Sequence, residues 1–330
     1  MKAPSFGPGS EFDLIRRLAG SAGSLPEGVR LGPGDDCAVL EGGVVVSSDL
    51  SVEDIHFRRA WIDLQEAGYR AAAGALSDLA AMGAEPLGIL LSMALAPEEA
   101  EEAAPALQAG AREACAREGI QILGGDLSRS PGPAVLDVVV LGRTEAPLLR
   151  SGSLPGDELW VTGWLGGSGA AVHQWTSGVD PSPTLRDAFS RPHPRIREIR
   201  WLRERTDIHG CIDLSDGLAG DAGHLAAASG VAVTLDTESL PIHPALAQEG
   251  FESPACLHFA LRGGEDYELC FSASPGTLDE HVPNFREAFG IPLSRIGLIE
   301  EGVGEVLLNT DGSRIHLDGG FSHFHGMEGE

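Results

Sequence analysis

The sequence predicts an α/β or α+β fold with about two domains. Its 330 residues correspond to about two domains of ordinary size, and a chain of this length buries enough surface to fold without a disulfide or a metal. Segments typical of strands and of helices are mixed through both halves of the chain. Prolines and glycines interrupt this pattern near residues 146–156, so we expect an N-terminal domain over residues 1–148 and a C-terminal domain over residues 149–330.

Two long helices and several strands are expected in the N-terminal half. Residues 64–82 form an alanine-rich stretch with helical spacing. Residues 97–118 open with Pro97 and acidic residues, which suit the first turn of a helix. Short apolar runs between turn residues predict strands. In this half they cover residues 37–40, 44–48, 87–94, 120–123 and 134–144.

The C-terminal half repeats this mixture, with a helix expected over residues 216–229. The glycine-rich turn 163–169 lacks the G-x-G-x-x-G order of a dinucleotide-binding loop, so a phosphate-facing or close-packing turn is favoured. Seven arginines in residues 186–205 are interpreted as a solvated or intersubunit helix face, except Arg191 and Arg195, which flank prolines in an expected loop. Expected strands cover residues 158–162, 211–214, 231–236, 268–272, 296–299 and 305–308.

The charge balance excludes several classes of protein. The chain has 23 basic and 49 acidic residues and a net charge of −26, so neither nucleic acid nor an anionic membrane is expected as its main partner. Lys2 is the only lysine. The chain therefore cannot supply the lysine of a Walker A loop, of a protein-kinase strand or of a pyridoxal Schiff base. If it handles phosphate, it must use arginine, backbone N–H groups or metal ions.

The cysteines and the N-terminal residues predict a cytoplasmic protein. The five cysteines are odd in number and widely spaced, without a C-x-x-C pair, which favours reduced thiols. The first 20 residues lack the apolar segment of a signal peptide. The longest apolar run, residues 87–96, is about half as long as a membrane-spanning helix and is expected to be a buried strand.

Carboxylates recur beside glycine or serine at the ends of the expected strands and helices. Hard cations such as Mg²⁺ prefer carboxylate, hydroxyl and water oxygens, and glycine allows backbone or phosphate to approach closely. One such turn alone is usually a solvated loop, but the combination favours a shared cation or phosphate site. The segments are 34–36, 47–49, 77–78, 124–126 and 213–217.

Asp78 and the segment 213–217 carry most of this inference. At helical spacing Asp78 shares a face with Ala71 and Met82. An ionised carboxylate on such an apolar face is costly unless it is paired. A metal ion or an arginine would pair the Asp78 carboxylate. Alternatively, the helix breaks there and Asp78 caps it. The segment 213–217 follows a strand and opens a helix, so its polar side chains either cap the helix or bind phosphate.

Three other candidates each keep two interpretations. Residues 263–268 place three acids beside two glycines, which suits either a cation site or a solvated turn. His56 is either a switchable donor or an ordinary surface residue. Phe321 either covers a ring-bearing ligand or pins the C-terminal tail to the core.

Seven motifs, taken in order, resemble those of a known family. They are residues 34–39, 48–49 with 56–57, 77–84, 124–126, 150–152 with 155–157, 212–218 and 263–269. Together they resemble thiamine-monophosphate kinases, within the superfamily of aminoimidazole ribonucleotide synthetase and selenophosphate synthetase. The first and third motifs are shared by the wider superfamily. The last motif, with His56-Phe57 and the segment 320–324, is closer to the kinases, and the resemblance covers about residues 11–324.

The resemblance implies ATP-dependent phosphorylation of thiamine monophosphate to thiamine diphosphate by direct transfer, with several Mg²⁺ ions. It implies a two-domain fold like that of aminoimidazole ribonucleotide synthetase, whose N-terminal sheets pair in a homodimer. Carried over residue by residue, it implies three groups of site residues. The metal ligands are Asp36, Ser47, Ser48, Asp49, Asp78, Asp126, Asp213 and Asp216, the ATP contacts are Gly125, Asp126, Arg150 and Ser215, and the contacts to thiamine monophosphate are His56, Glu265 and Phe321.

Elementary electrostatics agrees with this function. ATP and thiamine monophosphate are both anions, which a protein of charge −26 would repel unless cations lay between them. The acceptor phosphate is largely ionised at neutral pH, so no residue is expected to act as a covalent nucleophile or general base. The alternatives are another ATP-dependent enzyme of the superfamily, such as a purine-synthesis ligase, and a non-catalytic nucleotide- or metal-binding relative. Leu127 and Gly167 depart from the family pattern, which commonly has threonine and aspartate there.

Overall fold

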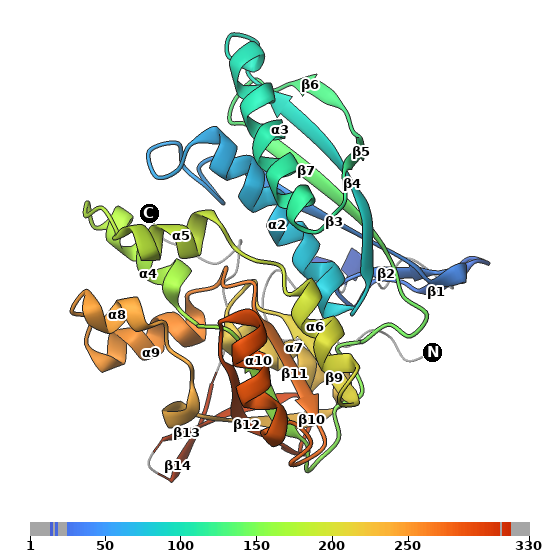
Figure 1. Cartoon of the computed structure of the whole chain (residues 1–330), viewed down its shortest axis with the longest axis vertical. Coiled ribbons are helices and arrows are strands. Elements are labelled where there is room, and N and C mark those ends of the chain that lie inside the picture. The colour runs from blue at the N-terminus through green and yellow to red at the C-terminus, as the bar shows by residue number, and fades with distance from the viewer. Residues whose placement is uncertain (1–13, 16, 19–24, 311, 318–330) are drawn as a thin grey trace.

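The computed structural model describes residues 14–15, 17–18, 25–310 and 312–317. Within them the chain forms two seven-stranded sheets, one after the other in sequence. Figure 1 shows the first sheet and its two long helices in the upper part of the molecule, and the second sheet with its shorter helices below. The mixed α/β architecture predicted from the sequence is confirmed.

The first sheet has the strand order β1-β2-β3-β7-β4-β5, and β6 also pairs with β4. At its centre β7 lies antiparallel to both β3 and β4. Helix α2 (Leu64–Ala81) packs on β3 and β7, and α3 (Ala100–Arg117) packs on α2 and β4. The strands are β1 (Val29–Leu31), β2 (Ala38–Leu40), β3 (Val44–Val52), β4 (Glu85–Leu95), β5 (Ile122–Gly124), β6 (Leu127–Arg129) and β7 (Val135–Arg143).

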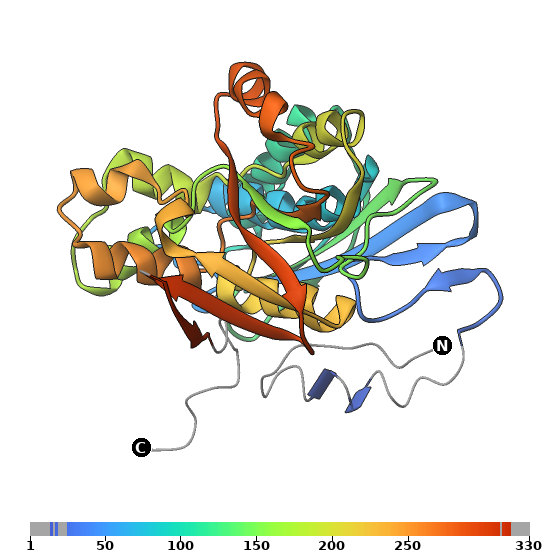
Figure 2. The ribbon, with the colours of Figure 1, turned by 90° about the horizontal axis from the view of Figure 1, so that it is seen from below.

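The second sheet has the strand order β14-β13-β10-β12-β8-β11-β9. Figure 2 views the molecule from below and shows this sheet next to the helices of the C-terminal half. Its strands are β8 (Glu158–Thr162), β9 (Ile208–Asp213), β10 (Val231–Asp236), β11 (Leu269–Ala273), β12 (Leu293–Glu301), β13 (Glu305–Thr310) and β14 (Ser313–His316). The helices are α4 (Gly167–Thr176), α5 (Pro183–Ser190), α6 (Ile196–Arg203), α7 (Leu218–Ser229), α8 (Pro244–Gln248), α9 (Ser253–Arg262) and α10 (Val282–Phe289).

Helix α2 contacts both sheets. Its start is fixed by a capping box, in which Asp63 accepts from the Glu66 backbone at 2.8 Å and Glu66 accepts from the Asp63 backbone at 2.9 Å. Small residues let α3 come close, because a Cβ on Gly68 would lie 1.9 Å from the Leu107 carbonyl oxygen. Helix α2 also contacts β9 of the second sheet. Its C-terminal end therefore places Asp78 at the junction of the two sheets.

Several boundaries differ from the sequence-based expectations. Helix α3 begins at Ala100 rather than at residue 97, because residues 97–99 form a turn before it. The arginine-rich segment forms two helices, α5 and α6, with Arg191 and Arg195 in the loop between them as expected. The predicted division at residues 148/149 falls between the end of β7 and the start of β8. The exact division stays a prediction.

The remaining sequence expectations concern thiols and membrane segments. All five cysteines are free and buried. In the described part of the chain, no helix combines the length and the apolar content that crossing a membrane requires.

Candidate active site

Three carboxylates from different elements meet where α2 lies against the second sheet. Asp36 lies in the loop between β1 and β2, Asp78 near the end of α2, and Asp213 at the end of β9. One carboxylate oxygen of each lies within 4.8 Å of the others. Asp36 and Asp213 are only 7% and 4% exposed. The structure thus brings together three of the predicted metal ligands, which we call the acidic cluster.

Burial and repulsion between carboxylates disfavour the charged forms of Asp78 and Asp213. Burial raises the pKa of Asp78 well above its ordinary value, and Asp213 and Asp36 raise it further. Burial, followed by repulsion from Asp36, raises the pKa of Asp213 to about 7. Such a site is relieved by binding either protons or a cation. A divalent cation would therefore gain strongly from binding here.

Arg150 is the arginine that contacts the acidic cluster. Its Nε and Nη2 atoms donate to Asp36 Oδ1 at 3.0 and 2.5 Å. Its backbone N–H lies 3.2 Å from both carboxylate oxygens of Asp35. The other oxygen of Asp36, Oδ2, is buried and has no hydrogen-bond partner among the described residues. A buried, unpartnered carboxylate oxygen beside two further carboxylates fits an oxygen-liganded cation such as Mg²⁺.

Strand β3 turns Ser47 and Asp49 toward the acidic cluster and Ser48 away from it, because side chains alternate along a strand. Both Ser47 and Asp49 interact with Asp78. Burial is the main cause that raises the pKa of Asp49 to about 6. The Ser48 hydroxyl instead donates to Asp137 on the exposed face, at 2.7 Å. The structure therefore does not bring the side chain of Ser48, a predicted metal ligand, to the acidic cluster.

The loop from β9 to α7 places Asp216 in a second group of polar side chains. Its carboxylate lies within 4.8 Å of ligand atoms of Asp221 and His224, which are both buried in α7. Asp221 also accepts a hydrogen bond from the Asp216 backbone at 3.1 Å. The turn requires Gly217, because its φ is 100° and a Cβ would lie 3.0 Å from the Leu261 carbonyl oxygen. The turn and α7 thus fix Asp216, which follows Asp213 of the acidic cluster by three residues in the sequence.

Two predicted thiamine contacts lie near β3 and α2. Glu265 has a φ of 59° and forms an ion pair with Arg70 of α2, whose side chain is only 4% exposed. The Arg70 guanidinium lies 3.9 Å from the centre of the Phe189 ring and donates to the Phe189 carbonyl at 2.5 Å. His56 follows β3, and its Nδ1 accepts from the Val52 backbone at 3.0 Å. Glu265 and Arg70 thus place an acidic and a basic side chain together at α2.

Gly125 and Asp126 lie outside the acidic cluster. They follow β5 and line a groove of about 660 Å³ with residues of β4 and α3. In the sheet order, β5 is three strands from β3, the strand of Asp49. That separation is about 14 Å at ordinary strand spacing. Asp126 is exposed, and its carboxylate accepts from the Leu127 backbone at 2.9 Å. Its role as a metal ligand stays a prediction.

Sequence reasoning did not assign three residues that contact this region. Arg70 carried a usable signal, because it is the single basic residue within the alanine-rich stretch of α2. Asp35 stands next to Asp36 in the first acidic turn, and Asp221 follows Asp216 at the start of α7. The third predicted thiamine contact, Phe321, lies outside the described residues.

Comparison with known proteins first defines a broad class. Residues 34–144 match the profile of the AIR synthase related protein N-terminal domain, and residues 155–309 match that of its C-terminal domain. The first matched segment holds β2 to β7 of the first sheet, and the second holds β8 to β12 and most of β13 of the second sheet. A chain with both domains is an AIR synthase related protein.

Known relatives identify the family within this class of proteins. Thiamine-monophosphate kinase of Rhodopirellula baltica is 35% identical over 303 residues, which cover 88% of this chain and 89% of the relative. The Escherichia coli K12 enzyme of the same name is 35% identical over 330 residues, covering 95% and 98%. The solved structure of AaThiL complexed with AMPPCP and TMP is 28% identical, has a TM-score of 0.79, and covers 95% and 96%. The chain belongs to the thiamine-monophosphate kinase family.

Proposed function

We propose that this protein transfers the γ-phosphoryl group of ATP directly to the phosphate of thiamine monophosphate, giving thiamine diphosphate and ADP. The observation that carries the proposal is the acidic cluster, in which three carboxylates converge within 4.8 Å at the junction of the sheets. Two highly charged phosphate substrates require such a site for cations. The relatives are thiamine-monophosphate kinases, and a structural neighbour was solved with AMPPCP and TMP.

The residues of the acidic cluster fit Mg²⁺, because their oxygens are hard ligands and one of these oxygens is buried without a partner in the part of the chain that the structure describes. Asp49 and Ser47 from β3 would complete this group, with Asp216 beside it. When bound there, Mg²⁺ would neutralise phosphate oxygens and favour the charge distribution of the transfer. This assignment explains why the chain keeps several buried acids together despite their repulsion.

The chain's own residues bind and orient the two substrates. Arg150, anchored on Asp36, offers a fixed positive charge to the ATP phosphates, and Ser215 contributes from the loop after β9. Glu265 is assigned to the positively charged thiazolium of thiamine monophosphate, and His56 is assigned to the same substrate. The acceptor phosphate is already ionised, so holding it in line with ATP is the main catalytic task. Gly125 and Asp126 are assigned to nucleotide through the groove beside β5.

A homodimer is part of the proposal. The outer face of the first sheet, opposite α2, carries the exposed leucines Leu50 and Leu90 beside the Ser48–Asp137 hydrogen bond. Exposed apolar side chains gathered on one sheet face are typical of an interface. We expect two copies of this face to meet. Sedimentation of the wild type and of Leu50→Glu tests this arrangement, with dissociation expected only for the variant.

The function is tested by incubating the protein with ATP, thiamine monophosphate and varied Mg²⁺, and by separating the products. Thiamine diphosphate and ADP are expected in equal amounts, and chelation of Mg²⁺ should abolish both. Turnover with formylglycinamidine ribonucleotide in place of thiamine monophosphate would instead indicate a purine-synthesis ligase. ATP binding without turnover of any phosphorylated acceptor would indicate a non-catalytic relative.

A further inference from the structure

The segment 264–268 joins the thiamine side of the site to the loop after β9. The Glu265 backbone donates to the Ser215 carbonyl at 2.7 Å, and the Tyr267 backbone donates to the Leu214 carbonyl at 2.8 Å. In return the Leu214 backbone donates to the Glu268 carbonyl at 2.8 Å. Any shift of this segment would therefore move both the carboxylate proposed for thiamine and the serine proposed for ATP.

The side chains of this segment point alternately to the two parts of the molecule. Glu265 and Tyr267 both have a positive φ, 59° and 51°, which is strained for residues with a side chain. They face α2, where Glu265 pairs with Arg70 and the Tyr267 ring packs against Gly74. Such a backbone persists only if the surroundings enforce it.

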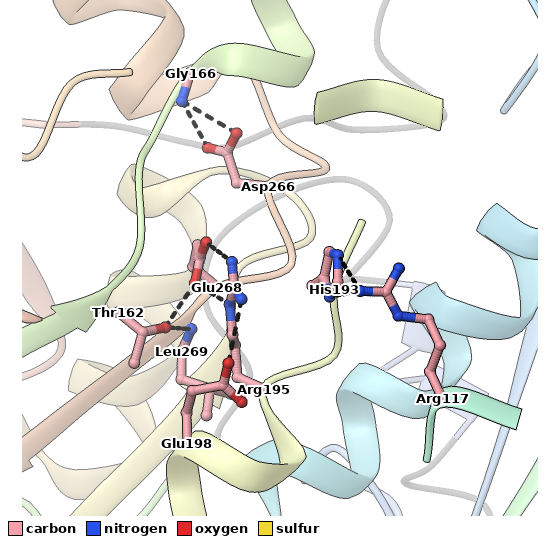
Figure 3. A network of polar contacts seen from close by, with 9 residues as sticks. All are labelled: Arg117, Thr162, Gly166, His193, Arg195, Glu198, Asp266, Glu268 and Leu269. Atoms are coloured by element: carbon pink, nitrogen blue, oxygen red, sulfur yellow. Dashed lines mark hydrogen bonds and ion pairs between the residues drawn. The ribbon is translucent and has the colours of Figure 1, made fainter. Parts of the chain in front are cut away.

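The side chains of Asp266 and Glu268, which alternate with those of Glu265 and Tyr267, form hydrogen bonds within the C-terminal half (Figure 3). Asp266 accepts from the Gly166 backbone at 2.9 and 3.1 Å. Glu268 accepts from Arg195 through both carboxylate oxygens, with 2.6 Å to Nε and 2.5 Å to Nη2. It also accepts from the Thr162 hydroxyl at 2.7 Å. The fork of Arg195 therefore fixes both the position and the plane of the Glu268 carboxylate.

The Arg195–Glu268 pair is held rigidly. The two side chains are 13% and 4% exposed. A Cβ on Gly163 would lie 1.8 Å from a carboxylate oxygen of Glu268, so no space is left on that side. The loop that carries Arg195 is also attached to α3, because Arg117 contacts His193 at 2.8 Å (Figure 3). Both ends of the pair are thus fixed by their surroundings.

A buried ion pair of this kind adds little net stability compared with apolar side chains, because desolvation offsets the attraction. The pair instead fixes the positions of the two side chains and of the backbone that carries them. We propose that Arg195 and Glu268 are positioning residues for thiamine monophosphate: the pair holds the strained segment 264–267 so that Glu265 faces the substrate. This inference rests on the proposed function and assigns the pair a role in binding the acceptor, without contact to it.

The test is Glu268→Gln, which keeps the shape of the side chain but replaces one acceptor oxygen by an NH₂ group. We expect the KM for thiamine monophosphate to rise about tenfold, because a small misplacement of a substrate contact weakens binding. The KM for ATP should change less than about twofold. The binding constant of thiamine monophosphate from calorimetry should weaken by the same factor as its KM rises.

Glu158→Gln is the matched control. Glu158 is also a buried glutamate of the second sheet, 5% exposed, and pairs with Arg295 at 2.6 Å. It lies at the start of β8, whereas Thr162 and the active-site segment lie at its other end. The control should lower the unfolding temperature while leaving both KM values unchanged. Equal changes of the two KM values in Glu268→Gln, or none, would overturn the inference.

If Glu268→Gln does not fold, the same KM measurements are made on the double variant R195Q/E268Q. It removes both charges of the pair together, so neither partner is left as an unpaired buried charge, and the two amides are able to hydrogen-bond. Glu198 loses only its longer contact with Arg195, at 3.3 Å. We expect a folded protein whose KM for thiamine monophosphate is still raised. A folded double variant with the wild-type KM would overturn the inference. Failure of the proposed function is recognised separately, because then the wild type itself would not phosphorylate thiamine monophosphate.

Discussion

Two regions of this molecule bury carboxylates in opposite ways. At the start of α2, Glu66 is 7% exposed, and its side chain pairs with Arg186 of α5. Burial alone would raise the pKa of Glu66, but the hydrogen bonds from Arg186 and the Asp63 backbone bring it below its ordinary value. Near the end of the same helix, Asp78 meets Asp213, and among the described residues neither of them forms an ion pair.

The presence or absence of an ion-pair partner distinguishes carboxylates with a structural role from carboxylates that bind a ligand. A paired carboxylate is satisfied within the fold, and removing it harms stability first. Carboxylates without an ion pair, such as Asp78 and Asp213, cost stability in the free protein, and they persist because a bound cation offsets that cost. Substitutions in the two regions should therefore have opposite effects on stability and activity.

The largest effect is expected for Asp78→Asn. Losing a charge at the acidic cluster should lower kcat at least about a hundredfold, because the developing charge of the transfer is then poorly balanced. In the absence of Mg²⁺ the unfolding temperature should stay the same or rise, because repulsion with Asp213 is relieved. Steady-state kinetics at saturating Mg²⁺ and thermal unfolding measure the two effects.

Glu66→Gln, in the same helix, is the matched control for this variant. It weakens the capping box and the pair with Arg186, and should lower the unfolding free energy by about 1 kcal/mol. Its kcat should stay within about twofold of the wild type. If instead Asp78→Asn loses stability and keeps its activity, Asp78 is a structural acid like Glu66.

The next largest effect is the pH dependence of the stabilisation of the protein by Mg²⁺. Asp213 has a folded pKa of about 7 against an ordinary value of 3.8. Between these values the folded state binds more protons than the unfolded chain, so this group makes the free protein less stable as pH rises from about 4 to about 7. Above pH 7 Asp213 is mostly ionised, so Mg²⁺ competes with fewer protons at this carboxylate.

Mg²⁺ should therefore stabilise the protein more at pH 8 than at pH 5.5. At one hundred times its dissociation constant, it should add about 2.7 kcal/mol to the unfolding free energy. Thermal unfolding with and without Mg²⁺ at both pH values measures this difference. An equal gain at the two pH values, or a gain that survives in Asp78→Asn, would place the metal elsewhere.

The smallest effect separates neighbouring positions on β3. Asp49→Asn should lower kcat about tenfold or more, because its carboxylate lies on the face of the acidic cluster. Ser48→Ala should change kcat less than about twofold, because its hydroxyl binds Asp137 on the opposite face. A large loss of activity in Ser48→Ala would show that Ser48 acts at the site despite the direction of its side chain.

The sequence predicted the fold class and named all three residues of the acidic cluster, because each rests on a local signal. The spacing of Ala71, Asp78 and Met82 along a helix is by itself enough to indicate a buried carboxylate. The glycine and aspartate turn after β9 likewise marks the end of a strand. Such signals identify the members of a site but not the distances between them.

The rest depends on contacts between residues far apart in sequence. The pair of Arg195 with Glu268 joins residues 73 positions apart, and no local pattern links them. The pairing of Arg70 with Glu265 is of the same kind. Strand alternation separates Ser48 from Asp49, but it does not say which face of β3 is buried. The position of Asp126 similarly depends on the order of strands in the sheet.

The most direct test of the account is a crystal structure with Mn²⁺, a non-hydrolysable ATP analogue and thiamine monophosphate. Manganese takes the same oxygen ligands as magnesium and is located by its anomalous signal. The account predicts manganese bound by the carboxylates of Asp36, Asp78 and Asp213, between the two phosphate-bearing ligands. Manganese bound elsewhere, with these three side chains unliganded, would contradict it.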